Sequence, residues 1–244
     1  MFDRPIPIVT KNLLILNGLF FLGTMVLSSQ GINLSQYLAL HYWGSEDFMP
    51  LQFVTYMFMH ANFTHILFNM FAVWMFGSTI EQYWGPKRYM LYYFVTGIGA
   101  GLIQLLTIYI QIQNVVPHMS PDMIDLVQRE GRDVIMRGMN YTNPLMASYN
   151  ALLNSTIVGA SGAVFGLLLA FGMMFPNVPL YLMFIPVPIK AKYMVLGYGL
   201  IELYSGLSNN PHDNVAHFAH LGGMLFGIVM ILYWKKRGDF YKPW

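Results

Sequence analysis

The sequence predicts an all-α, polytopic membrane protein, with six transmembrane helices forming a single domain over residues 1–244. Hydrophobic residues make up 56% of the chain and charged residues only 10%, whereas a soluble domain carries about 25% charged residues. Six stretches can cross a bilayer, whose hydrocarbon core of about 30 Å needs roughly 20 helical residues. Lysine and arginine also favour one side of these stretches. The small net charge of +2 gives no indication of nucleic-acid binding.

The six apolar stretches follow one another along the whole chain. The expected spans are 12–29, 62–83, 89–112, 155–175, 191–207 and 214–234. We interpret the first as a retained span and not a signal peptide, because no small-residue cleavage site follows it. The apolar stretch before the fifth span, 176–190, contains four prolines. We therefore expect a kinked connector there, at the membrane interface.

The positive charges predict how the bundle is oriented in the membrane. If the N-terminus is cytoplasmic, ten of the 13 Lys and Arg residues lie on the inner side. Only Arg129, Arg132 and Arg137 then lie outside. Because cytoplasmic loops are enriched in Lys and Arg, this distribution favours six spans with both termini in the cytoplasm.

Two outer loops are large enough to contain structure of their own. Loop 30–61 is rich in Tyr, Trp and Phe, which is typical of sequence at headgroup depth. In loop 113–150, Ser120 is a candidate N-cap and Pro121 a candidate first helical residue. Apolar residues then recur on one helical face, so we expect a short helix lying on the outer surface.

Polar and ionisable residues inside the spans cluster at one depth. The second span carries His65 and Asn69, the fourth Ser161, and the sixth His217 and His220. Counting about 1.5 Å per helical residue, Asn69 and His220 each lie about 10 Å below the outer end of their span, and Ser161 about 8 Å. Such residues are costly in lipid, and therefore mark functional sites. The common depth predicts one shared, water-accessible site in the outer third of the membrane.

Small residues predict that the fourth and sixth spans pack closely. Each carries G-x-x-x-G spacing, which lets helix backbones approach in lipid: Gly162 and Gly166 in the fourth span, Gly223 and Gly227 in the sixth. Close packing of these faces would bring the Ser161 hydroxyl near an imidazole nitrogen of His220. A serine hydroxyl becomes a good nucleophile when a base such as histidine takes its proton.

Three motifs in this order resemble the rhomboid family of intramembrane serine proteases. They are "HANFTHILFNMF" from His60, "GASG" around Ser161 and "HLGGMLFG" from His220. The resemblance covers residues 48–234 and implies a six-span fold, cleavage of transmembrane segments of other proteins within the lipid bilayer, and no cofactor or metal. The compact form resembles bacterial members, which implies the bacterial inner membrane.

The resemblance also assigns roles to individual residues. It implies Ser161 as the nucleophile and His220 as the general base. His65 and Asn69, together with the backbone N–H of Ser161, match the oxyanion hole. Phe165 matches a position whose aromatic ring packs against the catalytic histidine. The supporting positions that we expect around this site are His217, Gly159, Gly162, Gly223 and Gly227.

Some assignments stay open from the sequence alone. Glu202, an intramembrane carboxylate, either orients His220, bonds another helix or reaches the interface. A different class of function is a membrane binding or transport protein, in which histidines hold a metal or a proton; His60 and His65 would join His217 and His220 in such a site. We expect no carboxylate at suitable spacing to complete it. A third possibility is a catalytically silent rhomboid relative.

Overall fold

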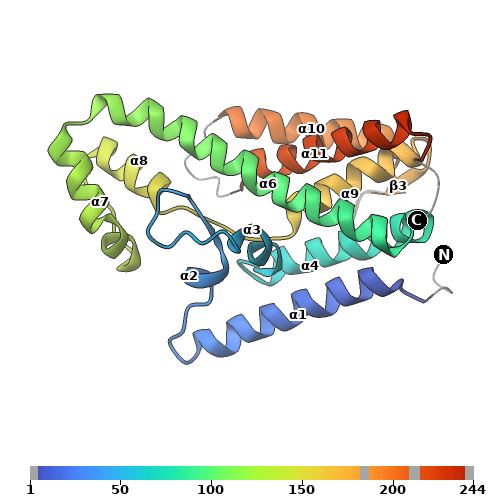
Figure 1. Cartoon of the computed structure of the whole chain (residues 1–244), viewed down its shortest axis with the longest axis horizontal. Helices are drawn as coiled ribbons and strands as arrows, with labels where there is room; N and C mark the ends of the chain where they lie inside the picture. The colour runs from blue at the N-terminus through green and yellow to red at the C-terminus, as the bar shows by residue number, and fades with distance from the viewer. Residues whose placement is uncertain (1–4, 182–186, 209–214, 240–244) are drawn as a thin grey trace.

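The computed structural model describes residues 5–181, 187–208 and 215–239, which form a helical bundle (Figure 1). The elements in chain order are α1 (Ile8–Ser28), α2 (Ser35–Leu38), β1 (Leu40–His41), α3 (Gln52–Thr55), a 3-10 turn (Tyr56–Phe58), α4 (Phe63–Ala72), a π-helical turn (Val73–Gly77), α5 (Ser78–Trp84), α6 (Pro86–Val115), a second 3-10 turn (Val116–His118), α7 (Pro121–Met136), α8 (Pro144–Leu153), β2 (Thr156–Ile157), α9 (Ser161–Met174), β3 (Pro179–Tyr181), β4 (Pro188–Lys190), α10 (Ala191–Ser208) and α11 (His217–Lys236). Within the described ranges, two short antiparallel β-ribbons, β1–β2 and β3–β4, accompany the helices.

The long helices run side by side and alternate in direction. In Figure 1, α1 begins and α11 ends at one end of the bundle, while α7 and α8 lie at the opposite end. Among the described residues, four helical stretches are long and apolar enough to cross a membrane: Ile8–Ser28, Phe63–Trp84, Pro86–His118 and His217–Lys236. Helix α9 is apolar but has only 14 residues, and α10 has 18. The predicted all-α, polytopic bundle is confirmed.

The fourth predicted span begins later than the sequence indicated. We expected a helix from residue 155, but α9 begins at Ser161. Residues Thr156 and Ile157 are extended and pair antiparallel with His41 and Leu40 of the first outer loop. Gly159 has a φ of +121°, which no right-handed helix contains. Because extended backbone at membrane depth must bond to protein groups, pairing with the outer loop makes this segment possible.

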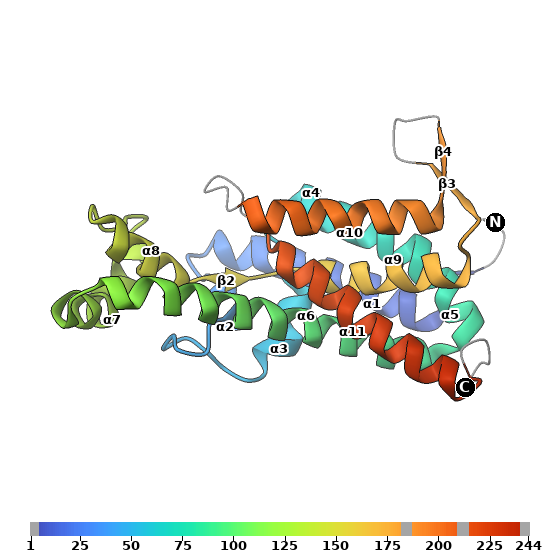
Figure 2. The same ribbon diagram turned by 90° about the horizontal axis from the view of Figure 1, so that it is seen from above.

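The connector before α10 also differs from the expectation. In its described part, β3 and β4 form an antiparallel ribbon, with Pro179 opposite Lys190 and Tyr181 opposite Pro188 (Figure 2). We expected a kinked interfacial connector because of the prolines. A two-stranded ribbon tolerates proline, since each strand has an outer edge that needs no N–H donor.

The outer loop 113–150 contains the expected surface helix and a second helix. Ser120 caps α7 by accepting a hydrogen bond from the Met123 N–H at 3.3 Å, and Pro121 is the first helical residue. The second helix, α8, repeats the same signal with an Asn143 cap and Pro144, and the sequence analysis missed it. A strong cap followed by proline begins a helix even where the segment is short.

Small residues bring α6, α9 and α11 into direct contact. A Cβ added at Gly223 of α11 would lie 1.9 Å from the Gly162 carbonyl oxygen of α9, so these two helices touch backbone to backbone. The other glycines of the two motifs face α6 instead: Gly166 meets Thr96, and Gly227 meets the Tyr92 hydroxyl. The predicted contact of the fourth and sixth spans is therefore present, but the glycines serve a three-helix junction.

Candidate active site

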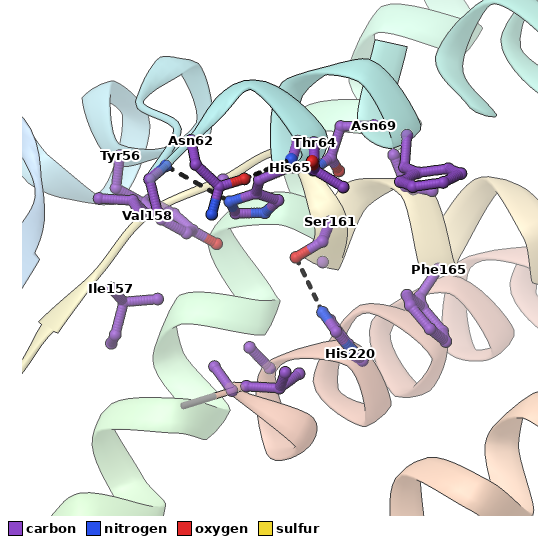
Figure 3. Close-up of a pocket in the computed structure, with 18 of the residues that line it drawn as sticks. Tyr56, Asn62, Thr64, His65, Asn69, Ile157, Val158, Ser161, Phe165 and His220 are labelled. Atoms are coloured by element: carbon purple, nitrogen blue, oxygen red, sulfur yellow. Dashed lines mark hydrogen bonds between the residues drawn. The ribbon is translucent and has the colours of Figure 1, made fainter. Parts of the chain in front are cut away.

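Ser161 and His220 meet in the interior of this three-helix junction. Ser161 is the first residue of α9 and His220 lies in the first turn of α11. The Ser161 Oγ lies 2.8 Å from the His220 Nε2, which is hydrogen-bond distance (Figure 3). His220 is 9% exposed. A hydroxyl and a largely buried imidazole at this distance can exchange a proton.

The backbone before Ser161 sets the position of its hydroxyl. Gly159 donates its N–H to the Tyr56 carbonyl at 2.9 Å, which fixes the chain as it enters α9. A Cβ at Gly159 would lie 2.7 Å from Cε1 of His65, so only glycine leaves room for that ring. Because Ser161 begins the helix, its N–H has no acceptor within α9. This N–H lies at the N-terminus of the helix, which is the positive end of the helix dipole.

The aromatic ring of Phe165 lies against the imidazole of His220. Their centroids are 4.2 Å apart and their planes differ by 8°, so the rings are stacked. Phe165 follows Ser161 by four residues on α9, which places it one turn further along the same face. The stack limits rotation of the imidazole and holds its Nε2 toward Ser161.

His65 and Asn69 lie on α4, on the other side of Ser161. Asn62 caps this helix by accepting from the His65 N–H at 2.8 Å. The Asn69 side chain donates one N–H to the His65 carbonyl at 2.9 Å. A carboxamide has two N–H donors, so one remains to face the site.

A cavity of about 670 Å³ opens between α4, α9 and α11. Its lining includes Gly159, Ser161, His220, His65 and Asn69. Figure 3 shows His65 and Asn69 on one side of Ser161 and His220 on the other. Of the five polar residues that the sequence placed at one depth, Ser161, His220, His65 and Asn69 therefore line this cavity, and His217 does not.

Glu202 of α10 lies next to both histidines of α11. Its Oε2 is 2.6 Å from the His217 Nδ1 and accepts a hydrogen bond there. The same oxygen is 2.9 Å from the His220 Nδ1. This second contact has ion-pair distance but not hydrogen-bond geometry, since the His220 Nδ1 has no hydrogen-bond partner. The expectation that no carboxylate would join these histidines was therefore wrong.

Sequence spacing could not identify this contact, because α10 and α11 are separate helices whose register depends on packing. The available signal was the carboxylate itself, which is costly in a membrane span without a partner. A negative charge near Nδ1 favours the tautomer with its proton on Nδ1. The His220 Nε2 is then free to accept the Ser161 proton.

His60 does not join the metal or proton site considered as an alternative. Its ring packs edge-on against His65, with centroids 5.1 Å apart, and it is 5% exposed. Within the described residues, the group of side chains with metal-ligating atoms in mutual reach consists of Glu202, His217 and His220. His60 is a packing residue beneath the His65 ring.

The fold and the site together define a class: a polytopic α-helical membrane protein with a serine and a histidine paired between two of its helices. A family model described as the Rhomboid domain matches residues 47–111 and 136–237, more than half of the chain. The chain belongs to the rhomboid family.

Individual relatives are similar to this chain at low identity. Rhomboid-like protein 11, chloroplastic, of Arabidopsis thaliana is 27% identical over 82% of this chain and 61% of its own length. RHOMBOID-like protein 12, mitochondrial, of the same plant is 28% identical over 70% and 42%. Rhomboid protease AarA of Providencia stuartii is 27% identical over 71% and 52%. The chain thus spans about half the length of the curated relatives it matches.

The names of these relatives bear on activity and compartment. One is named a protease and others only rhomboid-like, so the family supports intramembrane proteolysis as a family activity. Several carry chloroplastic or mitochondrial in their names. Membership of the rhomboid family confirms that this chain is a membrane protein. The organelle names give no support to the bacterial inner membrane, which the compact form led us to expect.

Proposed function

We propose that this protein is an intramembrane serine endopeptidase that cleaves transmembrane segments of other membrane proteins. The observation that carries the proposal is the 2.8 Å contact of the Ser161 Oγ with the His220 Nε2, beside a cavity. Catalysis by this pair requires no cofactor. The substrate reaches the cavity from the bilayer, as an unwound stretch of helix.

Acylation begins with proton transfer. The Ser161 Oγ forms a bond with the carbonyl carbon of the scissile peptide, while its proton passes to the His220 Nε2. The electron pair of the C=O bond moves onto oxygen, and the resulting oxyanion faces the Ser161 N–H and the donors of His65 and Asn69. The tetrahedral intermediate then collapses, and the leaving amine takes the proton from Nε2.

Deacylation repeats these steps with water. His220 removes a proton from a water molecule in the cavity, the hydroxide oxygen bonds to the acyl carbon, and the Ser161 Oγ leaves with the returned proton. A donor aimed at the oxyanion lowers the barrier by about 3–4 kcal/mol when it is preorganised. The helix begins at Ser161, so its N–H is oriented before the substrate binds.

The test is cleavage of a labelled transmembrane substrate by the purified chain. We expect Ser161→Ala to reduce the rate by at least about 10³-fold, because the nucleophile is lost. His220→Ala has the same effect, and His217→Ala a smaller one. Ser208→Ala, an exposed serine at the end of α10, is the matched control and retains the native rate. A fluorophosphonate probe labels the native chain and not Ser161→Ala.

Two results would refute the assignment. Full cleavage by Ser161→Ala would exclude this nucleophile. A native chain that neither cleaves nor reacts with the probe would be the catalytically silent relative.

A further inference from the structure

Three metal-ligating atoms converge behind the proposed catalytic histidine. The Glu202 Oε2, the His217 Nδ1 and the His220 Nδ1 lie within 4.8 Å of one another. The carboxylate comes from α10 and both imidazoles from α11. The three side chains are only 11–12% exposed.

The His220 Nδ1 is the atom that distinguishes this group from an ordinary hydrogen-bonded cluster. This nitrogen is buried, on a residue that is 9% exposed, and has no hydrogen-bond partner. It nevertheless lies 2.9 Å from the Glu202 Oε2. A buried donor or acceptor without a partner costs free energy, and a metal ion is one partner that would satisfy it.

We propose that Glu202, His217 and His220 form a Zn²⁺ site through which zinc reversibly inhibits the protease. The inhibition rests on the proposed function, whereas the binding does not. Two imidazoles and one glutamate are a known ligand set of zinc sites that keep an open fourth position. Zinc–ligand bonds of about 2.0–2.2 Å in a tetrahedron put ligand atoms roughly 3.3 Å apart.

Two of the three separations between these atoms lie close to that geometry. The carboxylate oxygen lies 2.6 Å and 2.9 Å from the two Nδ1 atoms. Each separation has to lengthen by less than about 1 Å for a zinc ion to enter between them. The two Nδ1 atoms lie within 4.8 Å of each other and would have to be about 3.3 Å apart around the ion.

Zinc at this site would remove the general base without touching the nucleophile. A neutral imidazole that binds zinc through Nδ1 carries its proton on Nε2. The His220 Nε2 then donates a hydrogen bond and can no longer accept the Ser161 proton. Glu202 and His217 are not among the residues that line the cavity, so we expect kcat to fall while KM stays unchanged.

Binding is measured first, on a chain that needs no activity. Calorimetric titration of ZnCl₂ into the full-length Ser161→Ala variant in detergent is expected to show one zinc per chain. Adding Glu202→Gln or His217→Asn to that variant weakens binding by at least about tenfold. Adding His118→Ala, an exposed histidine outside the group, leaves binding unchanged. Thermal unfolding verifies that each variant is folded.

Inhibition is measured second, on chains with Ser161 intact. Micromolar ZnCl₂ lowers kcat at least about tenfold with constant KM, and EDTA restores it. In His217→Asn the remaining activity loses this sensitivity to zinc. The proposed site is overturned if Ser161→Ala binds zinc equally well whether or not it also carries Glu202→Gln or His217→Asn. If zinc binding depends on these residues but zinc does not lower kcat, the proposed inhibition is overturned. If the native chain cleaves no substrate even without zinc, the proposed function is refuted, but the binding result still stands.

Discussion

At the scale of single residues, the pairing of Ser161 with His220 depends on the groups around the imidazole. Phe165 stacks on one face of the ring, 4.2 Å away. Glu202 lies 2.9 Å from the far nitrogen, Nδ1. The first contact fixes the plane of the ring, and the second favours the tautomer that leaves Nε2 as an acceptor. Neither group touches the reacting atoms, so we regard both as positioning residues.

Glu202→Gln tests the role of the carboxylate. We expect kcat to fall by about 10–100-fold with little change in KM, because the amide keeps the shape but not the charge that supports the proton on Nδ1. We expect Glu202→Asp, which keeps the negative charge, to have a higher kcat than Glu202→Gln. The measurement is steady-state cleavage of a transmembrane substrate.

The control for Glu202→Gln is Glu130→Gln, an exposed carboxylate on α7 that is expected to be neutral. Native kcat in Glu202→Gln would show that the carboxylate has only a packing role. A rise in KM without loss of kcat would place Glu202 in substrate binding instead.

At the scale of elements, the site depends on how closely α6, α9 and α11 approach. Gly223 meets the backbone of Gly162, and Gly162 itself meets Ala100 of α6. Without a hydrophobic driving force in lipid, such contacts provide the packing that holds helices together. The Ser161–His220 distance is set by this junction, since the two residues lie on α9 and α11.

Gly223→Ala tests this junction. The added methyl would lie 1.9 Å from the Gly162 carbonyl oxygen, so α9 and α11 have to separate. We expect a loss of about 1–3 kcal/mol in stability from overpacking. A displacement of about 1 Å at the reacting atoms costs about 10²-fold in rate.

Gly197→Ala on α10 is the matched control, because nothing lies within 4 Å of its added Cβ. Thermal unfolding in detergent and cleavage assays compare the two variants. If Gly223→Ala is as stable and active as Gly197→Ala, the close approach of the helices is not what sets the site.

At the scale of the whole molecule, carboxylates join parts that are distant in the chain. Glu81 of α5 accepts hydrogen bonds from the N–H groups of Val9 and Thr10, which begin α1, at 2.9 Å and 2.8 Å. Only 17% of the most apolar segment of α1 is buried inside the bundle. The hydrogen bonds from Glu81 are therefore a main contact that holds α1 to the other helices. At the other end, Asp47 of the first outer loop accepts two hydrogen bonds from Arg132 of α7, at 2.7 Å and 2.8 Å.

The Asp47–Arg132 pair predicts a pH dependence of stability. The hydrogen bonds from Arg132 lower the pKa of Asp47 below its ordinary value, against the opposing effect of burial. A lowered pKa stabilises the fold above the unfolded pKa of about 3.9 and ceases to do so as the pH falls through the folded pKa. We expect Asp47→Asn to cost about 1 kcal/mol at pH 7 and progressively less below about pH 4.

Thermal unfolding of native and Asp47→Asn chains between pH 7 and pH 3 measures this difference. Asp125→Asn is the control, because its ion pair with Arg129 is 63–66% exposed and contributes little. A gap between native and Asp47→Asn midpoints that is as large at pH 3 as at pH 7 would contradict the prediction.

The orientation of the helical bundle in the membrane is also a prediction about the whole molecule. The chain has no cysteine, so single-cysteine variants can be labelled without background. With both termini in the cytoplasm, a membrane-impermeant maleimide labels Arg129→Cys in intact bacterial host cells and Lys236→Cys only after lysis. Both positions are exposed in the fold. The reverse pattern would invert the orientation derived from the Lys and Arg distribution.

Most of the fold followed from local signals. Hydrophobic stretches of span length predicted the long helices, and the Ser120–Pro121 pair predicted α7, because both signals act within a few turns of the chain. The start of α9 did not follow. Residues 155–160 are apolar enough for a helix, but their pairing with Leu40 and His41 depends on a contact more than 100 residues away in the sequence.

The sequence by itself determined that this is a helical membrane protein and predicted polar groups at one depth, because the cost of burying backbone and charge in lipid acts on each segment separately. Only the tertiary structure decided which groups meet. The place of Glu202 between two histidines and the use of glycines at a three-helix junction depend on the register of helices against one another. That register is a property of the packed bundle, which no single segment encodes.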